Sequence, residues 1–150
     1  SIAYCFAQHQ GSVYVGGIFS AAGAQVTEGV ARWDGVRWHS VAGPIQAQRP
    51  TRVGSLVSSG SLLFAAGSFT NIGGVAVSNV ASWDGATWAP VGEGLPTGVS
   101  ALAWWDGSLY AGGLFVGGLF SSPTNVVAET IARWSGTTWE PLGSGCDNRV

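Results

Sequence analysis

The sequence is poor in charge. Lysine is absent, and six arginines against eight acidic residues leave a net charge of −2 over 150 residues. Only 9% of the residues are charged, whereas an average soluble domain has about 25%. Without a basic surface, we expect no binding to nucleic acid or to an anionic membrane. Surface charge normally prevents proteins from associating. Because this chain has little of it, we expect copies of the chain to cover one another's surfaces in a homo-oligomer or filament.

Long apolar runs are also missing. The richest stretch, LYAGGLFVGGLF at 109–120, is interrupted by glycines and is too short for a transmembrane helix. The first ten residues lack the basic start and the cleavage pattern of a signal peptide, so a secreted protein would be present here in its mature form or as a fragment. No asparagine begins an Asn-x-Ser/Thr sequence, so N-linked glycans are not expected.

Cysteine occurs only twice, as Cys5 and Cys146 near opposite ends of the chain. An even number without a CxxC motif argues against a metal or redox role and favours a disulfide bond. Such a bond would close the chain on itself or join two chains. Two reduced, buried thiols are the alternative.

Residue types that carry catalysis are scarce. His9 and His39 stand at non-equivalent places in the repeat described below, and a lone histidine in a hairpin is usually a surface residue. The tyrosines, histidines and cysteines do not have the spacing of a copper site. The acidic residues are too scattered for a calcium loop, and without lysine there is neither a Schiff base nor a P-loop. The sequence therefore predicts no enzyme activity, no catalytic residue, no metal and no cofactor.

What the sequence does have is a repeat rich in glycine and tryptophan. The stretch ARWDGVRW at 31–38 returns as ASWDGATW at 81–88 and as ARWSGTTW at 132–139. Copies about 50 residues apart are typical of propellers and solenoids. The chain is therefore predicted to be one repeat domain, 1–150, with blade 1 at about 1–46, blade 2 at about 47–95, blade 3 at about 96–147 and the start of a next repeat at 148–150. The residues repeated as the structural core are Trp33, Trp38, Trp83, Trp88, Trp134, Trp139, Phe19, Phe69 and Phe120.

Each repeat is expected to form four short strands, because no helical periodicity is sustained anywhere. The first strands are predicted at Ala3–Ala7, Val53–Val57 and Val99–Ala103, and the second at Val13–Val15, Leu63–Ala65 and Leu109–Ala111. Small residues follow the second strand as Gly16-Gly17, Ala66-Gly67 and Gly112-Gly113, which indicates a close backbone approach there. A polar loop of about ten residues and the tryptophan hairpin complete the unit.

The tryptophan hairpin is predicted to turn at Asp34-Gly35, Asp84-Gly85 and Ser135-Gly136. Asp-Gly suits a two-residue type I′ turn, which needs positive φ at both central positions. In that register Trp33 pairs with Val36 and Ala31 pairs with Trp38, so the two indoles are diagonal neighbours on one face. Alanines stand beside them, so we expect this face to interlock with another β-layer and to bury the indoles.

The segments LYAGG-x-F and IARWSGTTWEPLGSG at 131–145 resemble the repeat of secreted Kelch-like propeller proteins, similar to the central domain of galactose oxidase. The resemblance implies four-stranded blades around an axis and an extracellular location. The expected architecture is thus all-β, a propeller-type array of three four-stranded antiparallel blades that another chain or a longer assembly completes. Closed propellers have four to eight blades, so two chains closing one ring, a head-to-tail filament and a piece of a longer protein remain as alternatives.

The function expected from these patterns is that of a non-enzymatic extracellular structural or scaffolding protein that acts through self-assembly. The alternatives are a carbohydrate-binding propeller and an adhesion segment of a longer secreted protein. Trp104 and Trp105 have no aromatic counterpart in the other repeats. They are therefore candidates for a subunit contact, where tryptophan is enriched, or for a glycan site.

Overall fold

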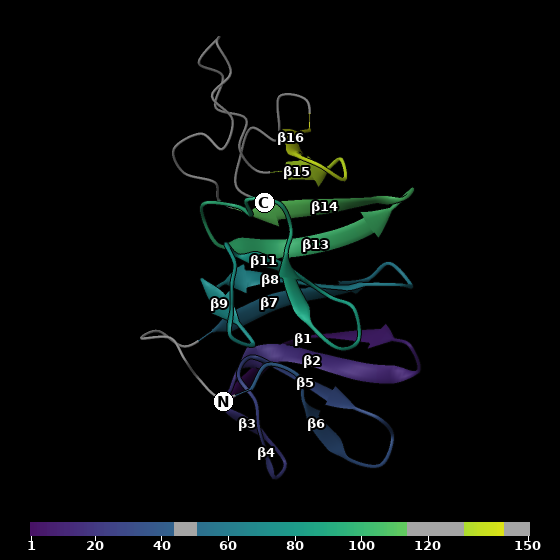
Figure 1. Cartoon of the computed structure of the whole chain (residues 1–150), viewed down its shortest axis with the longest axis vertical. Helices are drawn as coiled ribbons and strands as arrows, with labels where there is room; N and C mark the ends of the chain where they lie inside the picture. Colours follow the sequence, from purple (N-terminus) through teal and green to yellow (C-terminus); the bar gives the residue numbers. More distant parts are fainter. Residues whose placement is uncertain (44–50, 114–130, 143–150) are drawn as a thin grey trace.

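The computed structural model describes residues 1–43, 51–113 and 131–142, and all regular elements in these ranges are β-strands (Figure 1). The longer strands form three four-stranded antiparallel sheets, called sheets 1, 2 and 3 in chain order. For the described residues, the prediction of an all-β chain with one four-stranded antiparallel sheet in each repeat is confirmed.

Each sheet takes its strands in chain order. Sheet 1 consists of β1 (Ile2–His9), β2 (Ser12–Ile18), β5 (Val30–Trp33) and β6 (Trp38–Ser40). Sheet 2 consists of β7 (Arg52–Ser58), β8 (Leu63–Ser68), β11 (Val80–Trp83) and β12 (Trp88–Pro90). Sheet 3 consists of β13 (Val99–Trp105), β14 (Ser108–Gly113), β15 (Ile131–Trp134) and β16 (Trp139–Pro141).

Two small hairpins occupy stretches where the sequence predicted only a polar loop. The hairpin of the first repeat is β3 (Ala21–Ala22) with β4 (Gln25–Val26), and that of the second repeat is β9 (Asn71–Ile72) with β10 (Val75–Ala76). Along the chain, each hairpin comes between the second and third strands of the four-stranded sheet in its repeat. Strands of two residues are too short to show any periodicity, so the sequence pattern does not reveal them.

The three sheets follow one another along the long axis of the molecule (Figure 1). Their first strands are neighbours, because β7 contacts both β1 and β13. Two clusters of buried side chains join the sheets. One lies between sheets 1 and 2 around Val30, Leu56 and Ile72, and the other lies between sheets 2 and 3 around Phe64 and Leu109. The apolar core is therefore divided between the two junctions.

The paired small residues lie where the sequence predicted a close approach of the backbone. A Cβ atom added to Gly67 would lie 1.8 Å from the carbonyl oxygen of Arg52, and one added to Gly17 would lie 2.0 Å from that of Ile2. Opposite these glycines the first strand of every sheet has a β-bulge, centred on Tyr4, Gly54 and Ser100. The close approach and the bulge are thus one repeated feature.

The predicted type I′ turn of the tryptophan hairpin is wrong. Trp33 pairs directly with Trp38 and Ala31 pairs with Ser40, so the loop has four residues, 34–37, and the indoles are opposite neighbours. The carboxylate of Asp34 accepts hydrogen bonds from the backbone N–H groups of Val36 and Arg37, at 2.8 Å each. Because the aspartate side chain binds the loop's own N–H groups, a wider loop is favoured over the two-residue turn. Only Gly35 in this loop has a positive φ, of 100°.

The other two tryptophan hairpins have the same register. Trp83 pairs with Trp88 and Trp134 with Trp139. Asp84 accepts from the N–H groups of the residues two and three further on, and in the third copy the Ser135 hydroxyl replaces the carboxylate. Two consecutive residues with positive φ do occur, at Gln10-Gly11 and Asp106-Gly107 in the turn after the first strand and at Gly73-Gly74 in the hairpin that follows the second strand of sheet 2.

Candidate functional site

The most regularly repeated feature of the three sheets is the pair of tryptophans that each of them carries. The ring centroids of each pair are 5.2 to 5.4 Å apart. Direct pairing across an antiparallel ladder places both indoles on the same face of the sheet. The alanine two residues before the first tryptophan of each pair, at 31, 81 and 132, is fully buried. Large and small side chains therefore alternate on this face, as predicted.

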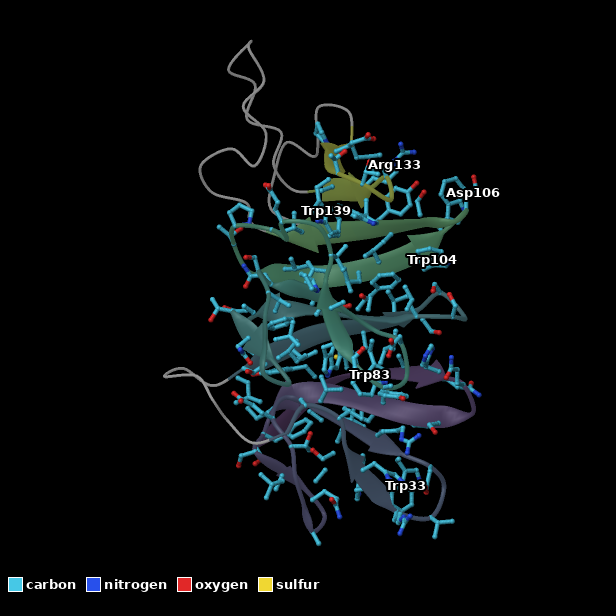
Figure 2. The ribbon with its side chains drawn as sticks, viewed as in Figure 1. Trp33, Trp83, Trp104, Asp106, Arg133 and Trp139 are labelled. Atoms are coloured by element: carbon cyan, nitrogen blue, oxygen red, sulfur yellow. The ribbon has the colours of Figure 1, made fainter. Side chains whose placement is uncertain are left out.

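The pairs differ in burial. Trp83 and Trp88 are 7% and 5% exposed, whereas the pairs of sheets 1 and 3 are half-buried. Figure 2 places Trp83 between sheets 1 and 2, and Trp33 on the side of sheet 1 away from sheet 2. The expectation that all six indoles are buried against another layer is therefore wrong for sheet 1, since no other described sheet lies against that face. The core phenylalanines also differ, because Phe69 is buried, Phe19 is half-buried and Phe120 lies outside the described residues.

A hydrogen bond from indole to backbone connects each sheet to the one before it. Trp88 Nε1 donates to the carbonyl oxygen of Val41 at 2.6 Å, and Trp139 Nε1 donates to that of Val91 at 3.1 Å. Both acceptors stand three residues after the second tryptophan of the preceding sheet. The equivalent acceptor in sheet 3 is Leu142, whose side chain is 44% exposed. Among the described residues, Trp38 Nε1 has no acceptor.

The surface beside Trp38 is an open apolar groove of about 240 Å³, which we call the open face of sheet 1. Its floor includes Val15, Ala31 and Gly23, and a Cβ on Gly23 would lie 2.9 Å from the Trp38 ring. In sheet 2 a Cβ on Gly73 would lie 2.7 Å from the Trp88 ring, but there residues 40–43 of sheet 1 cover the indole. The open face is thus built like the covered one and lacks only the covering segment.

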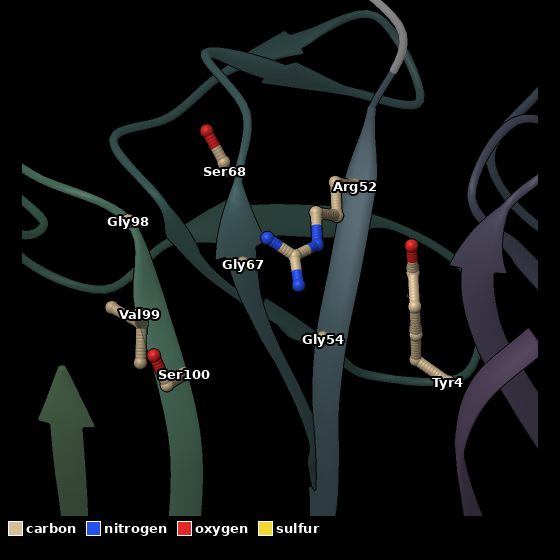
Figure 3. A pocket seen from close by; sticks show the side chains of 8 residues that line it. All are labelled: Tyr4, Arg52, Gly54, Gly67, Ser68, Gly98, Val99 and Ser100. Carbon is tan, nitrogen blue, oxygen red and sulfur yellow. The ribbon is translucent and has the colours of Figure 1, made fainter. Parts of the chain in front are cut away.

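A second, polar cavity of about 280 Å³ lies where the first strands begin (Figure 3). Four of its residues carry polar side chains, Tyr4, Arg52, Ser68 and Ser100, and the rest of the lining is Gly54, Gly67, Gly98 and Val99. The Arg52 guanidinium lies 5.0 Å from the centre of the Tyr4 ring, a cation–π contact. The sequence pattern does not reveal this cavity, because Arg52 and Tyr4 are distant from each other in the chain.

Trp104 and Trp105 have different environments. Trp104 stacks on Phe64 with ring centroids 5.7 Å apart, so it belongs to the packing between sheets 2 and 3. Trp105 is 67% exposed, and its ring lies 6.2 Å from that of Tyr110. Of the two candidates, only Trp105 offers an open aromatic surface to a ligand or partner.

The predicted disulfide is not supported by the structure. Cys5 is a free thiol, and Cys146 lies outside the described residues. The Cys5 sulfur lies beside Gly16, where an added Cβ would approach it to 2.6 Å, and packs against the core between sheets 1 and 2. Burial raises the pKa of this thiol to about 11, so it is protonated at neutral pH and a poor nucleophile.

The two histidines have different environments. His9 is only 2% exposed, its Nδ1 lies 2.7 Å from the Ser58 hydroxyl, and burial lowers its pKa. His39 is half-buried, and its Nε2 lies 2.5 Å from a carboxylate oxygen of Asp34. The prediction of a surface position is therefore wrong for His9. The turn glycine after it reverses the chain and brings its ring against Tyr14 in the core.

In the described ranges, no three histidine, cysteine, aspartate or glutamate side chains come together in a group that would hold a metal ion. The same ranges contain no helix with the length and apolar character needed to cross a membrane. No protein-family model matches the chain, and comparison with curated proteins finds no match.

Proposed function

We propose that this chain is a non-enzymatic extracellular structural or scaffolding protein that works by self-assembly. In this proposal the three sheets are blades of a Kelch-like, propeller-type array, and further copies complete the array as a multi-chain ring or a filament. The observation that carries the proposal is the hydrogen bond from an indole to a backbone carbonyl that is repeated between consecutive sheets. Sheet 1 has the equivalent donor in Trp38, and sheet 3 has the equivalent acceptor in the carbonyl of Leu142.

The indole N–H of Trp38 and the carbonyl of Leu142, which have no such partner within the described residues, support a specific joint. A second copy that places residues 139–142 of its sheet 3 on the open face would repeat the junctions between sheets 1 and 2 and between sheets 2 and 3. The carbonyl of Leu142 in one copy would then accept from Trp38 Nε1 in the other. The apolar groove around Trp38 supplies the contact area, because burial of apolar surface is the main driving force of association.

The scarcity of charge supports the same proposal. The side chains of Ile2 and Phe6 in β1 and of Val26 in β4 are 54%, 66% and 60% exposed. Ile2 lines the open face, and a large exposed apolar surface marks an interaction site. With a net charge of −2, electrostatic repulsion between copies is weak.

Light scattering at micromolar concentration tests the proposal, with Ala21→Arg as the diagnostic variant. Ala21 is exposed and lines the open face, so an arginine there obstructs docking without entering the core. Ala76→Arg is the matched control, an exposed alanine in the equivalent hairpin of sheet 2. We expect the wild type and Ala76→Arg to have the mass of several chains, and Ala21→Arg to have the mass of one.

A wild type that remains a single chain at all concentrations would refute self-assembly. Assembly unaffected by Ala21→Arg would refute the joint at the open face. Electron microscopy of the assembled material then separates closed rings from filaments.

A second candidate function is carbohydrate binding, and it rests on Trp105. An exposed indole beside Tyr110 offers a flat apolar surface of the kind on which sugar rings stack. On a glycan array, the wild type should then bind and Trp105→Ala should not, and an array without wild-type signal would exclude this candidate.

A further inference from the structure

The polar cavity beside Arg52 is formed by the β-bulges. Tyr4, Gly54 and Ser100 are the residues that the bulges of β1, β7 and β13 leave unpaired, and all three line the cavity. A bulge interrupts the ladder and redirects the side chain of the extra residue. Three neighbouring strands therefore direct their irregular positions into one space (Figure 3).

The repeated architecture does not explain the polar residues of this cavity. In the aligned repeats Arg52 occupies the position of Ile2 and Gly98, and Tyr4 occupies that of Gly54 and Ser100. The core positions, by contrast, keep tryptophan, alanine or glycine in each copy. Residues that differ between repeats and yet meet in one cavity point to a role other than packing.

Hydrogen-bond donors dominate the chemistry of the cavity. The Arg52 guanidinium reaches into it, the hydroxyls of Ser68 and Ser100 lie across from it, and no acidic side chain is among the lining residues. In the described part of the chain the ion pairs are His39 with Asp34 and Arg133 with Glu140, so Arg52 has no carboxylate partner there. The Tyr4 ring beneath the guanidinium restricts its orientation before any ligand arrives.

The glycines leave room for a ligand. A Cβ added to Gly54 would meet its nearest atom at 3.8 Å, and one added to Gly98 would meet its nearest atom at 3.6 Å. Neither glycine has a positive φ, so the backbone conformation does not require glycine at either position. The volume of about 280 Å³ is near the lower end of the range for small-molecule pockets, about 300–1,000 Å³.

We propose that this cavity binds the carboxylate group of a small ligand about the size of one acidic sugar. The planar guanidinium of Arg52 donates two parallel hydrogen bonds to the carboxylate, the geometry for which arginine is best suited. The hydroxyls of Ser68 and Ser100 contact the remaining polar groups of the ligand. This site is separate from the open face of sheet 1, so its function does not depend on self-assembly.

The test is a titration of the folded chain with glucuronate, followed by amide chemical shifts, with glucose and inorganic sulfate as parallel probes. Glucuronate should give saturable shifts around Tyr4, Arg52 and Ser100, and glucose should give none. Arg52→Gln should weaken binding by at least about tenfold, since hydrogen bonds to a charged group are among the strongest. Arg52→Lys should recover only part of the affinity, because an ammonium group cannot donate in the bidentate geometry.

Two controls keep the outcome clear. Arg37→Gln removes an equal charge from an exposed hairpin loop and should leave glucuronate binding unchanged. Gly54→Ala fills part of the cavity without a steric conflict and should weaken binding while the protein stays folded. Binding that Arg52→Gln does not change, shifts that do not saturate, or equal binding of glucose or sulfate would overturn the proposal.

Discussion

At the scale of single residues, glycine determines how closely the first two strands of each sheet approach. At Gly67 the Cβ position is occupied by the carbonyl oxygen of Arg52 at 1.8 Å, which is backbone and cannot rotate away. At Gly54, in the bulge opposite, the Cβ position is open. The two glycines lie close together and yet have different structural requirements.

Gly67→Ala should therefore destabilise the chain by about 1–3 kcal/mol, the usual cost of overpacking a filled site. Gly54→Ala should leave the free energy of unfolding unchanged or raise it by up to about 1 kcal/mol, because alanine restricts the unfolded chain more than glycine does. Urea unfolding of both variants measures the difference. Equal stabilities of the two variants would contradict the assigned close approach.

The sequence pattern predicted the environment of the paired small residues but not that of His9. The paired small residues indicated the close approach because they recur at the same position in every repeat, at the end of the second strand. His9 was expected on the surface, but its burial depends on Tyr14 and on Ser58 of the next sheet. Such contacts between sheets have no local signature in the sequence.

At the scale of elements, the tryptophan hairpin shows how a side chain sets the register of two strands. The pattern predicted the hairpin and placed both indoles on one face, but it predicted a two-residue turn. Asp34 and Asp84 instead bind two N–H groups of a four-residue loop. The Asp-Gly pair is compatible with both turns, so the sequence alone does not choose between them.

These hydrogen bonds make the hairpins sensitive to acid. The hydrogen bond from His39, followed by those from the N–H groups of Arg37 and Val36, holds the pKa of Asp34 well below its ordinary value. The N–H groups of Thr87 and Ala86 lower the pKa of Asp84. Because the folded state has the lower pKa, these carboxylates stabilise it fully above the unfolded pKa of about 3.9, and the contribution is lost as the pH falls further.

The temperature of thermal unfolding should therefore decline between about pH 6 and pH 2. Buried His9, whose pKa is lowered in the folded state, contributes from the upper end of this range, and Asp34 and Asp84 contribute as the pH falls below about 3.9. The double variant Asp34→Ser and Asp84→Ser copies the uncharged loop of Ser135. It should be less stable than the wild type at pH 6 and should lose less on acidification. A double variant with the same dependence on pH as the wild type would show that other titratable groups, such as buried His9, cause the decline.

At the scale of the whole molecule, the number and order of the sheets followed from the repeat, because each copy carries its own strand and turn signals. The unequal burial of the tryptophan pairs did not follow, since identical repeats have different neighbours. Only sheet 2 lies between two described sheets, and its indoles are the most buried. Position in the array thus decides how much each copy of the same residue contributes to stability.

Trp88→Phe should reduce the free energy of unfolding by about 2 kcal/mol or more, because it opens a cavity and leaves the carbonyl of Val41 without its donor. Trp38→Phe, measured at a concentration where chains are single, should cost less than about 1 kcal/mol, since its indole is half-buried and lacks the hydrogen bond to the backbone. Urea unfolding at low concentration compares the two. Equal losses would contradict the inference that sheet 1 has an uncovered face.

The acceptor of the indole bond is a main-chain carbonyl in both observed junctions, at Val41 and at Val91. Every residue type provides that group, so mutation of the acceptor residue's side chain leaves the connection available. A gene that gains a repeat by duplication therefore inherits a donor for the previous unit and an acceptor for the following one. A chain can therefore become longer during evolution without acquiring a new kind of contact between its sheets.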